Sequence, residues 1–346
     1  MDMGREDVAA RLEQHLIGDF RMKRAVALLA LMLSSGTAAA DTPVAEMSQF
    51  RLYSAFWQNL HHFLYVSAWA NRPILPRAPR LAMPLPQEPV ASLTADEQAT
   101  WNAAVTSYDR NIASKDLLFD DDLTRIKVAL ADADDALRNV RIDEALRSAL
   151  LEAAPIYRKY WWSEHDAANR SWIALVSRQT PTVAAPIIER LTALYGVRWF
   201  ATPIRVDIVR VGKSQGAYTS INPRPHIVVA SGDGSYDGWS GTEMLFHEAS
   251  HALFNNVRLA INSAAEAANK QPRDLWHVVL FYIAGEVTRQ QLAKTGVEYR
   301  PYLYATGLFD RAWPAFREPI ERHVRPFVDG QLTLDRMAVE LAQALP

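Results

Sequence analysis

The chain has 346 residues, of which 49% are hydrophobic and 10% aromatic, and these proportions indicate a folded protein with a well-filled core. The 37 Lys and Arg residues nearly balance the 39 Asp and Glu residues, and a net charge of −2 without a basic cluster argues against nucleic acid as a partner. No apolar run approaches the length of a membrane span, and the absence of cysteine excludes disulfides and a lipid-anchored cysteine.

The first 40 residues have the features of a secretory signal that follows a short extension. A basic pair precedes an apolar run over residues 25–33, and small residues follow up to Ala40, which is typical of a cleavable signal peptide. Residues 1–21 carry mixed charge and do not fit such a signal. We therefore expect Met22 to be the true start, cleavage to occur near Ala40, and the mature protein to be periplasmic or secreted.

From residue 41 to about residue 195 the sequence is mostly helical by its periodicity. Apolar side chains recur at spacings of three and four, and a proline-rich connector over residues 73–89 interrupts them. The pattern predicts helices over residues 44–70, 94–114, 123–138, 142–153 and 156–179. We therefore expect a helical region over residues 41–195, followed by a second region over residues 196–346.

Three short strands are predicted at the start of the second region. Residues 204–211 alternate between apolar and polar side chains, and residues 218–221 and 226–230 are further strand candidates. Between the last two segments lie Pro223 and Pro225, which cannot donate hydrogen bonds to a neighbouring strand. The sequence therefore predicts a small sheet with an edge strand, and this sheet leads into a helix.

That helix contains the most informative motif of the chain, His247-Glu248-Ala249-Ser250-His251. Ser240 and Glu243 are spaced as a capping box, and the apolar residues around the motif predict a buried helix. Histidines four residues apart lie on one helix face, so both imidazoles can bind one metal ion while Glu248 stands beside the remaining coordination position. Without a metal, two buried imidazoles need hydrogen-bond partners in the core.

The motif resembles the active-site helix of the zincin metallopeptidases, and the resemblance covers this short stretch of the chain. It implies a zinc ion and a third protein ligand, and the residues after His251 do not continue with the H-x-x-G-x-x-H pattern of the metzincins. It also implies that an extended substrate lies along a sheet edge above the zinc. The expected fold is α+β and mostly helical, with a small mixed sheet before the motif helix and a second, ligand-bearing helix after it.

Glu286 is the expected third ligand, by similarity to the gluzincins, in which a Glu on a following helix completes the site. The segment between Pro272 and Gly296 is predicted to form a long helix whose register places Glu286 among apolar side chains. A buried carboxylate needs a cation nearby. Gly285 is expected to let this helix approach the motif helix closely.

Two alternatives to this ligand assignment remain open. Glu286 is spaced to form an ion pair with Arg289, three residues further along the same helix. His277 is the other candidate ligand, and it lies nine residues before Glu286, which is about half a turn around a regular helix. Only one of His277 and Glu286 can therefore face a metal bound to the motif.

The resemblance also implies a mechanism. Three protein ligands leave zinc a fourth position for a water molecule, whose pKa falls toward 7. Glu248 is expected to deprotonate this water as it attacks a polarised carbonyl, and then to pass the proton to the leaving amine. Zincins often use a Tyr or His to stabilise the oxyanion. Tyr304 and His323 are preferred here because they follow the ligand helix, ahead of Tyr302 and His165.

The sequence therefore predicts an exported zinc peptidase that acts on a peptide or protein substrate, with neither a nucleic-acid partner nor a membrane span. One alternative is a catalytically silent zincin-like domain that binds a peptide or polymer and holds a structural metal. Another is a zinc amidohydrolase that acts on an amide outside proteins. Glu248 argues against the silent domain, because a structural site needs no base and normally has a fourth protein ligand.

Overall fold

The computed structural model describes residues 42–70, 93–212, 216–271 and 273–345. The predicted signal peptide, the proposed start at Met22 and the proline-rich connector lie outside the described residues. The described residues belong to one compact unit. This unit includes both of the regions that the sequence predicted, residues 41–195 and residues 196–346. Within these ranges no helix combines the length and the apolar character that crossing a membrane requires.

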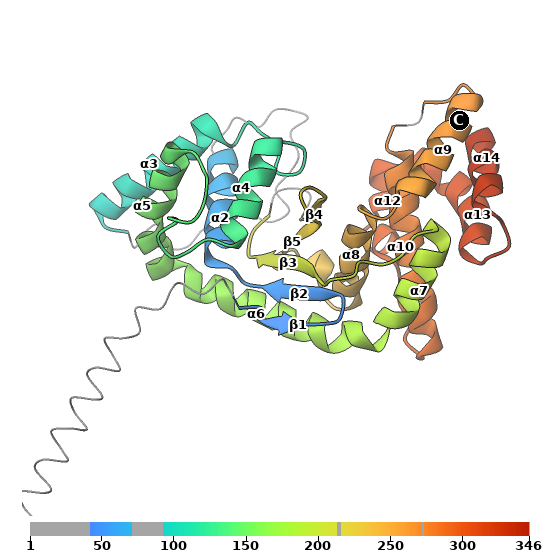
Figure 1. Cartoon of the computed structure of the whole chain (residues 1–346), viewed down its shortest axis with the longest axis horizontal. Coiled ribbons are helices and arrows are strands. Elements are labelled where there is room, and N and C mark those ends of the chain that lie inside the picture. Colours follow the sequence, from blue (N-terminus) through green and yellow to red (C-terminus); the bar gives the residue numbers. More distant parts are fainter. Residues whose placement is uncertain (1–41, 71–92, 213–215, 272, 346) are drawn as a thin grey trace, which may run out of the picture. The chain divides into compact units, whose positions relative to one another are not determined.

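The described residues contain one mixed sheet of five strands (Figure 1). Its spatial order is β1-β2-β3-β5-β4; β2, β3 and β5 run parallel, whereas each outer strand is antiparallel to its neighbour. The strands are β1 (Ala45–Glu46), β2 (Phe50–Tyr53), β3 (Ile204–Val209), β4 (Ala217–Ser220) and β5 (His226–Ala230). The three strands predicted from residue 204 onward are thus confirmed, with β4 at an edge of the sheet.

The first two strands lie where the sequence predicted the start of a helix. Residues 44–70 contain β1 and β2 before the helix begins at Phe56. β2 pairs in parallel with β3, with Phe50 opposite Ile204. The Phe50 side chain is fully buried, so this short segment is held by partners far along the chain rather than by its own periodicity.

Six helices occupy the amino-terminal part of the described chain. The predicted helices over residues 94–114 and 123–138 are present, although the second ends earlier, at Ala131. The predicted break at Pro155 lies inside a helix, and the chain changes direction instead at Trp161. The six are α2 (Phe56–Ala70), α3 (Ala95–Asn111), α4 (Asp121–Ala131), α5 (Glu144–Tyr160), α6 (Trp162–Gln179) and α7 (Ala184–Tyr195).

The carboxyl-terminal part is also helical, and it contains both predicted site helices. The motif helix is α8, and the helix predicted between Pro272 and Gly296 is α10. The helices are α8 (Trp239–Ser250), α9 (Asn255–Ala267), α10 (Leu275–Lys294), α11 (Tyr302–Ala305), α12 (Leu308–Ala312), α13 (Arg317–Val328) and α14 (Leu334–Ala344). The expected α+β, mostly helical fold is confirmed.

The two faces of the sheet pack against different helices (Figure 1). Because strand side chains alternate between faces, Val206 and Ile208 join a core with α6 to α10, whereas Val209 joins a core with α2 to α5. On β4, Ala217 belongs to the first core and Tyr218 to the second. The next residue, Thr219, therefore points toward the same side of the sheet as α8.

The predicted capping box at the start of the motif helix is not formed. Helix α8 begins at Trp239, so Ser240 already lies inside it, and no side chain caps its first turn. Glu243 is fully buried instead, and its carboxylate accepts hydrogen bonds from the Tyr299 hydroxyl at 2.6 Å and from the Tyr302 backbone N–H at 3.0 Å. This carboxylate therefore fastens the segment after α10 to the motif helix.

A buried ammonium group lies on the other face of the sheet. Lys127 on α4 is 1% exposed; it donates to the His226 carbonyl oxygen at 3.1 Å and lies 4.5 Å from the centroid of the Tyr218 ring. Burial lowers the pKa of this ammonium group to about 7, while the negative charges of Asp207 and Glu248 act in the opposite direction. Lys127 thus connects the amino-terminal helices electrostatically to the motif helix.

Candidate metal centre

Three histidines converge where α8 meets the first turn of α10. His247 lies on α8, His251 is the C-cap residue of this helix one turn later, and His277 faces both from α10; one ring nitrogen from each lies within 4.8 Å of the others. The Nε2 atoms of His247 and His251 are 3.2 Å apart. Three nitrogen donors at this spacing are a ligand set that Zn²⁺ accepts.

The two helices run antiparallel, and their side chains meet at successive turns. One turn beyond the contact between His251 and His277, the His247 ring stacks on Phe281, with centroids 3.7 Å apart. At the next turn a Cβ atom on Gly285 would lie 2.9 Å from Oε1 of Glu243. Packing at Gly285 is therefore close, but the nearest neighbours of such a Cβ are side-chain atoms of Glu243 and of Pro301, the latter also 2.9 Å away, and not the backbone of the motif helix.

The three imidazoles are neutral because they are buried. Burial lowers the pKa of His251 to about 3 and that of His277 to about 4, and it lowers the pKa of His247 well below its usual value. A neutral imidazole keeps the lone pair that a metal ion needs. Burial is uneven, since the His247 residue is 1% exposed whereas the His251 side chain is 17% exposed. Solvent therefore reaches the site from the side of His251.

Glu248 stands beside these histidines in a buried environment. Its Oε2 atom lies 4.0 Å from Nε2 of His251 and accepts a hydrogen bond from the Thr219 hydroxyl at 2.7 Å. Burial raises the pKa of this carboxyl group to about 7, and the Thr219 hydrogen bond and the Lys127 charge oppose that rise. A carboxyl group in this position is suited to exchange a proton near neutral pH.

The structure does not bring Glu286 to the histidines. Its carboxylate accepts hydrogen bonds from Nε of Arg289 at 2.9 Å and from Nη2 of the same residue at 2.5 Å. His277 precedes Glu286 by nine residues, so the two side chains leave α10 on opposite sides. The structure therefore places His277, and not Glu286, beside the two motif histidines, and an ion pair satisfies the buried carboxylate of Glu286.

Tyr304 and His323, the expected oxyanion donors, are engaged elsewhere. The Tyr304 hydroxyl donates to Glu321 at 2.9 Å, and Nδ1 of His323 lies 3.3 Å from a carboxylate oxygen of Glu340. These contacts connect α11 to α13 and α13 to α14. Position after the ligand helix was the reason for preferring both residues, and it does not determine which way a side chain points.

Tyr302 lies nearer the site than either preferred residue. Its ring stacks on Phe281, with centroids 6.0 Å apart and planes at 14°, and Phe281 in turn covers His247. The Tyr302 ring also stacks with that of Tyr236, and the two centroids are 5.5 Å apart. No sequence motif identified Tyr236 or Thr219 as a site residue, because neither lies on the motif helix.

Two tryptophans flank the exposed side of the histidine cluster. The centroids of Trp276 and Trp313 lie 5.2 Å and 5.8 Å from that of His277, and both side chains are partly exposed. Trp276 also contacts His251 edge-on at 5.9 Å. The entrance to the cluster is therefore largely aromatic.

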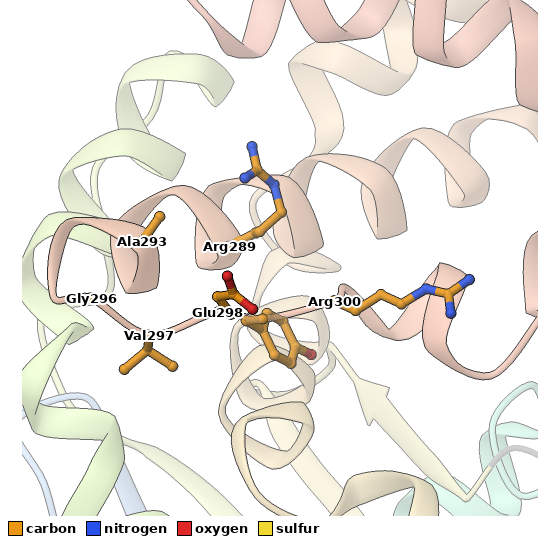
Figure 2. Close-up of a pocket in the computed structure, with 7 residues that line it drawn as sticks. Arg289, Ala293, Gly296, Val297, Glu298 and Arg300 are labelled. Atoms are coloured by element: carbon orange, nitrogen blue, oxygen red, sulfur yellow. The ribbon is translucent and has the colours of Figure 1, made fainter.

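A separate cavity of about 650 Å³ lies at the other end of α10 and does not include the histidines. It is lined by residues 296–300 together with Arg289 and Ala293. Figure 2 shows that the side chains of Arg289 and Arg300 point in different directions. Since Arg289 is also paired with Glu286, these guanidinium groups do not form a common anion site.

The chain was compared with protein-family models, with curated proteins and with solved structures, and no match was found. The resemblance to zincins therefore rests on the motif and on the residues gathered around it.

The described residues around the cluster fit a zinc ion that keeps one open position. Only the three histidines form a group of His, Cys, Asp or Glu side chains close enough to hold a metal within the described ranges. Structural zinc sites normally use four protein ligands, whereas hydrolytic sites use three and leave the fourth position for water or substrate. The three histidines thus match the number of protein ligands that is typical of hydrolytic zinc sites, and this number alone does not identify the metal or the reaction.

Proposed function

We propose that the protein is a zinc-dependent hydrolase that cleaves peptide bonds, with His247, His251 and His277 as metal ligands and Glu248 as general base. The convergence of three neutral imidazoles beside a buried carboxylate supports this proposal most directly. The five-residue motif itself supplies two of the ligands and the base, and α10 supplies the third ligand.

The reaction assigns a distinct task to each residue. The three imidazoles would hold the zinc ion, which would supply the Lewis acidity that polarises a carbonyl and activates water. The carboxylate of Glu248 accepts a proton from the attacking water and then donates it to the leaving nitrogen. Its buried position keeps this proton from exchanging freely with solvent.

Tyr302 is the side chain that we assign to the oxyanion in place of Tyr304 and His323. Its ring stacks with those of Phe281 and Tyr236, and its hydroxyl lies 3.2 Å from Oγ of Ser235. A hydroxyl held in this way is oriented before substrate binds, which is the property that an oxyanion donor requires.

The substitution Glu248→Gln tests this function. The full-length protein and the variant are analysed for zinc by elemental mass spectrometry and for cleavage of a mixed peptide library. We expect one zinc per chain in both proteins and loss of cleavage in the variant, because an amide cannot accept the proton. Glu298→Gln, at an exposed position after α10, is the matched control and is expected to remain active.

Other outcomes would favour the alternatives. A wild-type protein that binds zinc without cleaving any peptide would support the silent binding domain or an amidohydrolase with a non-protein substrate. Full cleavage by Glu248→Gln would contradict the assigned base.

A further inference from the structure

Strand β4 contacts the motif helix through one hydroxyl group. Thr219 is 5% exposed, and its Oγ1 atom lies 2.7 Å from Oε2 of Glu248 and 3.0 Å from the Glu248 carbonyl oxygen. The strand itself is fixed by antiparallel pairing with β5, in which Thr219 stands opposite Ile227. The hydroxyl is therefore attached to the sheet, whereas the carboxylate that it contacts belongs to α8.

We propose that Thr219 is the positioning residue for the general base, and that it holds the Glu248 carboxylate in the orientation from which a proton is transferred. This inference rests on the proposed function of Glu248 and deepens it by adding a residue that has no place in the five-residue motif.

The first support is that Thr219 is the hydrogen-bond donor of this carboxylate. Within the described part of the chain, the Thr219 hydroxyl donates the one hydrogen bond that the Glu248 carboxylate accepts. The Glu side chain has three rotatable bonds, so an unattached carboxylate can take several orientations beside the histidines. One strong hydrogen bond to a charged group selects among these orientations.

The second support is the rigidity of the donor. Thr is branched at Cβ, which restricts its χ1 rotation, and the alternation of β4 turns Thr219 toward α8 while Tyr218 faces the other core. The contact also spans two elements, because the same hydroxyl lies within hydrogen-bonding distance of the α8 backbone. Sheet and helix therefore fix the base together.

The neighbouring Ser220 provides a natural control on the same strand. It is 6% exposed, and its hydroxyl is buried without a hydrogen-bond partner in the described structure. Removing this hydroxyl changes the polarity of β4 without touching Glu248. A Ser220→Ala variant therefore measures what the loss of a buried hydroxyl does to the strand alone.

The experiment compares Thr219→Val, Thr219→Ser and Ser220→Ala with the wild-type and Glu248→Gln full-length proteins. For each protein we would measure zinc content, the midpoint of thermal unfolding, and kcat and KM on one peptide substrate. Val keeps the shape of Thr and removes the hydroxyl, whereas Ser keeps the hydroxyl and removes the methyl group.

We expect Thr219→Val to bind one zinc, to show a KM close to that of the wild type, and to lose about 10- to 100-fold in kcat, as befits a lost hydrogen bond to a charged group. Thr219→Ser is expected to retain kcat within about threefold, and Ser220→Ala to be unchanged. Rescue by Ser is the result that a purely structural role of Thr219 would not produce.

Two results would overturn the inference while leaving the function in place. One is wild-type kcat in Thr219→Val, and the other is an equal loss of kcat in Thr219→Val and Thr219→Ser, since both would remove any role for the hydroxyl. If the wild-type protein cleaves nothing, or if Glu248→Gln cleaves as well as the wild type, both the proposed function and this inference are contradicted.

Discussion

The ring of Phe281 lies against the imidazole of His247, with centroids 3.7 Å apart and planes inclined by 29°. This contact fixes the plane of a side chain whose Nδ1 atom has no hydrogen-bond partner in the described structure. Metal-binding histidines are usually oriented by a hydrogen bond from the second ring nitrogen. Here a stacked aromatic ring takes over that orienting role.

Phe281→Leu is therefore expected to weaken zinc binding. Loss of an aromatic contact worth roughly 0.5–1.5 kcal/mol corresponds to zinc affinity about 2- to 12-fold lower. Competition with a fluorescent chelator measures this change. Phe309→Leu, at a fully buried position that packs on Tyr304, is the control and is expected to keep wild-type zinc affinity. Equal zinc affinity in both variants would remove the orienting role of Phe281.

The choice between His277 and Glu286 as third ligand gives a second prediction. His277→Ala is expected to lower zinc affinity by more than the roughly 10- to 100-fold typical of a residue that only supports a ligand. Glu286→Ala is expected to retain one zinc per chain, because its carboxylate is bound to Arg289. Zinc content after dialysis against a weak chelator distinguishes the two variants. Loss of zinc in Glu286→Ala with retention in His277→Ala would restore the gluzincin assignment.

The buried ammonium of Lys127 predicts a dependence of stability on pH. Burial lowers its pKa from 10.5 to about 7, so between these values the folded protein binds fewer protons than the unfolded chain. The free energy of unfolding therefore rises with pH across this range, by up to about 1.4 kcal/mol per pH unit, and Lys127 is most unfavourable to folding below pH 7.

Denaturant unfolding of Lys127→Met at several pH values tests this dependence. We expect the variant to gain most stability over the wild type at pH 6, and the gain to diminish as the pH approaches 10. Lys294→Met, at an exposed position on α10, is expected to show a small difference that does not change with pH. A constant gain across the range for Lys127→Met would contradict the assigned titration.

Close packing at Gly285 predicts the effect of a single methyl group. In Gly285→Ala the new Cβ would lie 2.9 Å from Oε1 of Glu243 and 2.9 Å from Cβ of Pro301, so the buried Glu243 carboxylate and the segment at Pro301 must shift. We expect a loss of about 1–3 kcal/mol in the free energy of unfolding, larger than the helix-propensity gain of about 1 kcal/mol. Gly234→Ala, whose new Cβ would lie no closer than 3.7 Å to its nearest neighbour, is the matched control in thermal unfolding.

Local patterns in the sequence were sufficient for much of the fold. Strands β3 and β5 carry runs of β-branched residues, and α10 ends within two residues of Gly296, as the helix stop signal predicted. Strand β2 was missed because its pairing with β3 involves residues that lie far apart in the chain. The predicted helices over residues 142–153 and 156–179 leave a break at residues 154 and 155, yet α5 continues through Pro155, since packing outweighs one lost hydrogen bond.

The part of the site that comes from residues close together in the sequence was predictable. The motif spacing fixes His247, Glu248 and His251 on one helix, and helix geometry shows that His277 and Glu286 exclude each other. Which of the two faces the motif depends on how α10 rotates against α8, and that rotation is set by contacts such as Phe281 on His247. Thr219 reaches Glu248 from the sheet, and no sequence spacing describes such a contact.

The three proposed ligands lie on both sides of the segment that contains α9, in a chain without cysteine. An ion held by His251 and His277 at once would close this segment into a loop and act as a reversible cross-link, comparable in its effect on the unfolded chain to a disulfide. Folding and metal supply would then be thermodynamically linked: every tenfold excess of free zinc over its dissociation constant adds about 1.4 kcal/mol to the folded state. A shortage of zinc would thus lower the stability of the folded protein as well as prevent the proposed reaction.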